Sequence, residues 1–148
     1  MVQQKLDSKI VIDASLRAAE ILTGMGYQGK YGSVHLLRLN IQTNTLTAKL
    51  HNMIAWQISE LDKRWALHQV DGLNAYLTND DGSAIQFRVI CGKRKEINRI
   101  KPLPGLYSVI TYSKSTTDSL TSIKIEKIEM VEVTADDWLI QEKPARIF

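Results

Sequence analysis

The residues best suited to contact a ligand form a basic segment near the middle of the chain. Between Gly92 and Pro102, five of nine residues are lysine or arginine and one is glutamate. Guanidinium and ammonium groups neutralise phosphates, and tyrosine rings stack on bases. Together with one arginine before the segment and two tyrosines after it, the pattern predicts a single-stranded nucleic-acid site made of Arg88, Lys93, Arg94, Lys95, Arg99, Lys101, Tyr107 and Tyr112.

A purely structural role would explain the same residues. Phe87 shares one strand face with Ile85 and Val89, which favours burial in a core. Tyr107 and Tyr112 fall on opposite faces of their strand, so at most one of the two rings joins the basic groups. The net charge of the chain is only +3, and basic runs of this size are commonly solvated loops.

The chain offers little that suggests catalysis. Three isolated histidines, His35, His51 and His68, and one cysteine do not form the spacing of a zinc site, and no G-x-S-x-G nucleophile motif occurs. Cys91 ends a predicted strand, which favours a half-buried structural thiol. We therefore expect no catalytic residue, no metal, no cofactor and no enzymatic activity.

A glycine-rich segment, Gly24–Gly32, has the G-x-x-x-x-G-K spacing of a phosphate-binding loop. Such a loop needs a Ser or Thr after the lysine, a strand before it and a helix after it. Tyr31 occupies the hydroxyl position and the flanking elements are reversed, so a nucleotide site is rejected. The segment is interpreted as a turn. The alternative is a contact loop in which Tyr27, Lys30 and Tyr31 bind a partner.

The elements that would hold the basic segment are predicted to form a curled antiparallel sheet over residues 83–133. Alternating apolar residues predict strands at Ile85–Val89 and Leu106–Lys114. The final strand, Ile123–Val133, changes its apolar phase, which predicts a β-bulge around Glu126 and Lys127.

The first half of the chain is predicted to pack on that sheet. A helix is expected over residues 13–23 with Asp13 as its N-cap, followed by a hairpin of Ser33–Ile41 and Thr45–Leu50. A second helix is expected over residues 52–68, and a strand at Leu73–Thr78. Trp56 lies off the apolar stripe of that helix, where it would widen the stripe or mark a contact surface.

These elements predict one α+β domain over residues 1–148. Its parts are a helix, hairpin and helix at about 10–68, an OB-like β core at about 73–133, and a short C-terminal tail at 134–148. No apolar run is long enough to span a bilayer, and residues 1–8 lack the apolar centre of a signal peptide. We therefore expect a cytoplasmic protein without a membrane partner.

Part of the predicted sheet resembles a known family. Gln86–Lys93, Pro104–Tyr112 and Ile123–Val131 are similar to the second half of the bacterial single-stranded-DNA-binding protein family. In that family a strand ending in Gly-Lys is followed by a short helix, a Gly-led strand and a last strand. The resemblance covers residues 83–133 and implies an OB-like barrel, a shape that often binds oligonucleotides.

Two functions follow as hypotheses. The first is non-catalytic binding of single-stranded nucleic acid through the basic segment and adjoining strand faces. The alternative is a protein-interaction module, such as an adaptor, inhibitor or phage or plasmid accessory protein, that uses Trp56, Trp138, the Tyr27–Tyr31 segment or an open sheet edge. Exposure of either tryptophan within an apolar patch would favour the alternative. A homo-oligomer is compatible with both.

Overall fold

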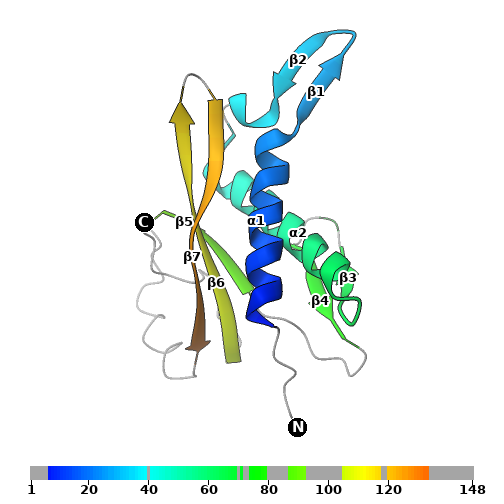
Figure 1. Cartoon of the computed structure of the whole chain (residues 1–148), viewed down its shortest axis with the longest axis vertical. Coiled ribbons are helices and arrows are strands. Elements are labelled where there is room, and N and C mark those ends of the chain that lie inside the picture. Colours follow the sequence, from blue (N-terminus) through cyan, green and yellow to red (C-terminus); the bar gives the residue numbers. More distant parts are fainter. Residues whose placement is uncertain are drawn as a thin grey trace.

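The computed structural model describes residues 7–39, 41–69, 71, 74–79, 87–92, 105–117 and 120–133. Within these ranges, two helices pack on one side of a three-stranded sheet, and two short hairpins lie beside them (Figure 1). The basic residues Lys93, Arg94, Lys95, Arg99 and Lys101 lie outside the described residues, as do residues 134–148 with Trp138.

The two helices bury their small and aliphatic residues. Helix α1 (Ser8–Gly24) is capped by Asp7, whose side chain accepts a hydrogen bond from the Lys9 backbone N–H at 2.9 Å. Helix α2 (Thr43–Leu61) contacts α1 and the sheet through four fully buried side chains at a spacing of four residues, Leu46, Leu50, Ile54 and Ile58. Ala14 and Ala18 of α1 are fully buried in the same core, and their small size allows close packing.

The sheet contains β5 (Phe87–Cys91), β6 (Gly105–Thr117) and β7 (Leu120–Val133), with β6 in the centre. Strands β5 and β6 are parallel, and β6 and β7 are antiparallel. The pairing of β6 with β7 skips Glu126, because Thr111 pairs with Lys127 and Tyr112 pairs with Ile125. This irregularity confirms the predicted bulge, and it turns both Ile125 and Ile128 toward the main core.

One hydrogen-bond chain ties α1 to the last strand. The Thr23 hydroxyl donates to the Ala19 carbonyl at 2.8 Å and accepts from the Ile123 backbone N–H at 3.2 Å. The main core lies between the helices and the sheet, while Ile90, Tyr107 and Val109 form a second small cluster.

Two hairpins complete the described fold. Strands β1 (Gly26–Gly29) and β2 (Gly32–His35) form an antiparallel pair that extends away from the body (Figure 1). The 3-10 turn η1 (Leu36–Arg38) follows it. Strands β3 (Ala66–His68) and β4 (Tyr76–Thr78) form the second antiparallel pair near the end of α2.

The structure corrects the boundaries in the first half of the chain. Thr45–Leu50, predicted as a strand, belongs to α2, because Leu46 and Leu50 continue the four-residue spacing that packs against α1. The second helix was predicted at residues 52–68 but ends at Leu61. There the Asp62 carboxylate accepts from the Arg64 backbone N–H at 3.1 Å and starts a turn that leads into β3.

The α+β class is confirmed, and the first helix, predicted at residues 13–23, starts earlier at Ser8. The described strands form one mixed sheet and two small antiparallel sheets, none of which closes into a barrel. The expected antiparallel pairing is therefore wrong for β5 and β6, which run parallel, and the OB-like barrel is not confirmed.

Candidate interaction site

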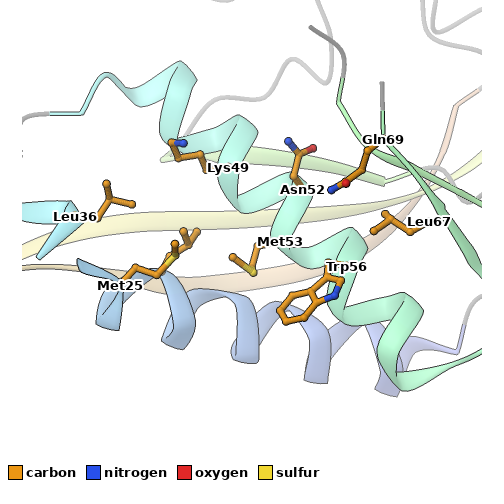
Figure 2. Close-up of a pocket in the computed structure, with 9 residues that line it drawn as sticks. Met25, Leu36, Lys49, Asn52, Met53, Trp56, Leu67 and Gln69 are labelled. Atoms are coloured by element: carbon orange, nitrogen blue, oxygen red, sulfur yellow. The ribbon is translucent and has the colours of Figure 1, made fainter. Parts of the chain in front are cut away.

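A cleft of about 510 Å³ lies where the end of α1, the η1 turn, α2 and β3 meet (Figure 2). This volume is in the range of sites that hold small ligands or partner side chains. Most of the lining is apolar: Leu22, Met25, Leu36, Met53, Trp56 and Leu67. The polar lining residues are Lys49, Asn52 and Gln69.

Helix α2 supplies the longest wall of the cleft. Lys49, Met53 and Trp56 follow one another at spacings of four and three residues, so they share one face of the helix. The opposite face is buried in the core. Figure 2 shows Met53 and Trp56 lying apart from Lys49, Asn52 and Gln69, so the cleft has an apolar side and a polar side.

Large apolar side chains remain open to solvent at this cleft. Trp56 is 41% exposed and Met25 is also 41% exposed. Trp65, by contrast, is buried in the main core with 2% exposure. Trp56 and Met25 line the same cleft, so together they form part of a larger apolar surface, which is more informative than a single exposed side chain.

Two neighbouring residues of α2 fix the helix to the chain before β4. The Asn52 side-chain oxygen accepts from the Ala75 N–H at 2.8 Å, and His51 Nε2 lies 2.9 Å from the Ala75 carbonyl oxygen. Because a carbonyl only accepts, His51 Nε2 is the donor. These two hydrogen bonds fix the position of α2, the cleft wall, relative to the start of β4.

His51 is buried and neutral in this position. Its ring stacks on Phe87 of β5 with 4.2 Å between centroids and 13° between planes. Burial lowers the pKa of His51 from 6.5 to about 4, against the opposing effect of the hydrogen bond to Ala75, and the charge of Arg88 lowers it further. His51 therefore joins α2 to the sheet without carrying a charge at neutral pH.

The structure describes three of the residues predicted to bind nucleic acid. Arg88 is half-buried on β5, with its guanidinium carbon 5.5 Å from the centre of the Tyr107 ring and its Nε buried without a hydrogen-bond acceptor. Tyr107 is 2% exposed and Tyr112 is fully buried. The two tyrosines lie in different clusters, as their predicted opposite faces require, and either ring would have to leave its cluster to stack on a base.

The other predicted contact residues have a different environment. Trp56 lines the cleft, while Tyr27 and Tyr31 are 45% and 83% exposed on the β1–β2 hairpin. Sequence reasoning identified Trp56 as lying off the apolar stripe of its helix but missed Met25 and Met53. The spacing of Met53 and Trp56 on one face of α2 was the signal available in the sequence.

Groups typical of metal sites do not gather in the described part of the chain, where no set of three or more His, Cys, Asp or Glu side chains could hold an ion. Cys91 is half-buried, as predicted. No helix within the described ranges has the length and apolar character needed to cross a bilayer. Comparison with known protein families, curated proteins and solved structures finds no match for this chain.

Proposed function

We propose that this chain is a non-catalytic protein-interaction module whose cleft binds bulky apolar side chains on an acidic amphipathic helix of a partner. The observation that carries the proposal is the half-exposed Trp56 at the edge of an apolar cleft. Tryptophan is among the residues that most often dominate binding energy at protein interfaces, because its large ring desolvates fully in a complementary pocket.

The shape of the cleft supports a helical partner. Lys49 and Trp56 are seven positions apart on α2, with Met53 between them, and this separation corresponds to about 10 Å along a helix axis. A partner helix lying in such a groove would insert side chains at positions i, i+4 and i+7. The unbranched side chains of Met25 and Met53 can adapt to the shape of an inserted residue.

The charge around the cleft supports an acidic partner. Residues 21–59 contain no aspartate or glutamate, whereas Lys30, Arg38 and Lys49 are basic. Glu60, one helical turn after Trp56 on α2, forms an ion pair with Lys63 at 3.3 Å. Lys49 is the charged residue of the cleft lining and takes part in none of the ion pairs of the described residues. Carboxylates on the partner would therefore meet an attractive potential and no repulsion from acidic groups of this stretch.

The experiment is selection of a phage-displayed library of 16-residue helical peptides on the wild-type protein, followed by affinity measurement on Trp56→Ala. Enriched peptides are expected to carry apolar residues at i, i+4 and i+7 with Glu or Asp between them. Truncation of Trp56 should cost at least about 2 kcal/mol of binding free energy, or about 30-fold in Kd.

Leu16→Ala is the matched control, because Leu16 is a 53% exposed apolar residue of α1 that does not line the cleft. It should leave the Kd unchanged. The proposal fails if no peptide is enriched, if the enriched peptides are basic, or if they bind Trp56→Ala as tightly as the wild type.

A further inference from the structure

The β1–β2 hairpin is a second exposed feature, separate from the cleft and independent of the proposed function. All eight residues of its two strands are exposed, and the hairpin extends beyond the end of α1 (Figure 1). Lys30 and Tyr31 form the two-residue turn at its tip. A two-stranded hairpin gains little stability alone, so its side chains must either brace it or contact something else.

One face of the hairpin carries the bracing contacts. Tyr27 pairs with Val34 across the strands, and Tyr31 stacks near Tyr27 with 6.5 Å between ring centroids. The Tyr31 backbone N–H donates to the Tyr27 hydroxyl at 3.2 Å, and Lys30 Nζ lies 5.3 Å from the Tyr31 ring centre. These contacts hold the turn, with Gly32 supplying the positive φ of 114° that the reversal requires.

The opposite face is narrow and polar. Gln28 pairs with Ser33, and Gly26 pairs with His35, so this face presents hydrogen-bonding groups and little apolar surface. The side chains of Gln28, Ser33 and His35 make no hydrogen bond within the described part of the chain. A Cβ at Gly26 would overlap the Val34 carbonyl oxygen, so the strands approach closely here.

The electrostatic setting of the hairpin favours a polyanion. The nearest acidic residues in the sequence are Glu20, in α1, and Glu60, in the last turn of α2. Lys30 lies at the tip, where its ammonium is exposed to solvent. A polar face with free donors and acceptors, close to the lysine at the tip, matches the edges of base pairs better than it matches an apolar protein surface.

We propose that the β1–β2 hairpin binds double-stranded DNA, with Gln28 and Ser33 facing base edges in the major groove and Lys30 contacting a phosphate. A two-stranded β-ribbon fits the major groove of B-form DNA, and glutamine can pair with an adenine edge there. The major groove of an RNA duplex is too deep and narrow for this contact, so the ligand is DNA.

The test is fluorescence anisotropy of a labelled 20-base-pair DNA duplex, and of one of its strands alone, with the full chain at two salt concentrations. The duplex should bind more tightly than the single strand. Lys30→Gln should weaken duplex binding about three- to tenfold. It should also make the slope of log K against log salt concentration shallower by about one, the value for one lost phosphate contact. Lys30→Arg keeps the charge and should restore binding.

Lys63→Gln is the matched control because it removes the same charge as Lys30→Gln. Lys63 is a highly exposed lysine that lies just after the C-terminal end of α2. It should leave duplex binding within about twofold of the wild type, because an exposed ion pair far from the site contributes little. Gln28→Ala should reduce the preference for duplexes that contain A·T pairs over duplexes of G·C pairs alone.

Three results would overturn the proposal: no duplex binding, equal weakening by Lys30→Gln and Lys63→Gln, or binding of the single strand alone. The last would instead support the nucleic-acid site predicted from Arg88 and residues 93–101. None of these results would affect peptide selection at the cleft, which depends on Trp56.

Discussion

Two pairs of tyrosines behave in opposite ways in this molecule. Tyr107 and Tyr112 lie on β6, the central strand of the sheet, and are almost completely buried. Tyr27 and Tyr31 lie on the β1–β2 hairpin and are exposed. The Tyr112 hydroxyl lies 2.7 Å from the Thr47 hydroxyl, which itself donates to the Thr43 carbonyl, so Tyr112 is the donor.

The difference comes from what covers each strand. Strand β6 lies between two other strands. Tyr112 packs with Ile110 in the main core against the helical layer, and Tyr107 packs with Ile90 and Val109 in the second cluster, so both rings are buried. Within the described ranges, the strands of the hairpin pair only with each other, and both of its tyrosines are exposed. An aromatic residue in a strand is therefore a binding candidate only when no second layer covers that strand.

The largest expected effect is on stability, from loss of a buried tyrosine. Tyr112→Ala should reduce the free energy of unfolding by about 3–5 kcal/mol, because it leaves a cavity in the main core. Tyr112→Phe should cost about 1 kcal/mol, for the hydrogen bond to Thr47. Urea unfolding measures both values.

Tyr31→Ala is the comparison from the hairpin and should change the same quantity by less than about 0.5 kcal/mol. Equal losses for Tyr112→Ala and Tyr31→Ala would show that the two regions do not differ in the way described.

The next effect is on the pH dependence of stability. The pKa of His51 is lowered from 6.5 to about 4 in the folded protein, so between these values the unfolded chain binds a proton that the folded chain does not. The contribution of neutral His51 to the free energy of unfolding should therefore be fully present above pH 6.5. It should be lost as the pH falls toward 4, which lowers the free energy of unfolding by about 3 kcal/mol in total.

Urea unfolding at half-unit steps of pH measures this loss. His51→Gln should flatten the slope of unfolding free energy against pH between pH 6.5 and 4. It should also lower stability at pH 7, because the stacking of the His51 ring on Phe87 is lost. Ser33→Ala, which changes an exposed hairpin residue that has no titratable group, should keep the wild-type slope. If His51→Gln keeps the pH dependence of the wild-type protein, the proton taken up on unfolding belongs to another group.

The smallest effect on stability should come from breaking the hairpin itself. Gly26→Val should abolish the pairing of Gln28 with Ser33, because its side chain would overlap the backbone of Val34. The loss of cross-strand nuclear Overhauser effects would report it, while the unfolding free energy should change by less than about 0.5 kcal/mol.

Gly24→Ala provides the control, since a Cβ there would meet no neighbouring atom. It should preserve the cross-strand effects. A large loss of global stability in Gly26→Val would show that the hairpin supports the body.

Features with a local cause were predictable from the sequence. The bulge at Glu126 was visible as a change of phase between Ile125 and Ile128, and the first helix was visible in its apolar spacing. Leu46, Ala48 and Leu50 alternate like a strand, yet Leu46 and Leu50 also lie one helical turn apart. Only contact with α1 decides between the two interpretations.

Features that depend on distant contacts were not predictable. Strands β5 and β6 run parallel, and nothing in the residue pattern of either strand specifies the direction of their pairing. The cleft depends on the positions of four separate elements, so Trp56 could be suspected from the sequence but Met25 could not.

The bulged strand has a consequence for self-association. Among the described residues, strand β7 is an edge of the sheet, and an unpaired edge is a template for polymerisation through strand addition. Glu126 interrupts that edge and is fixed by a hydrogen bond from Ser113, while Lys124, Lys127 and Glu129 place charges along it. Fibre-like stacking through this edge is thereby opposed, and any dimer of the chain should form through another surface.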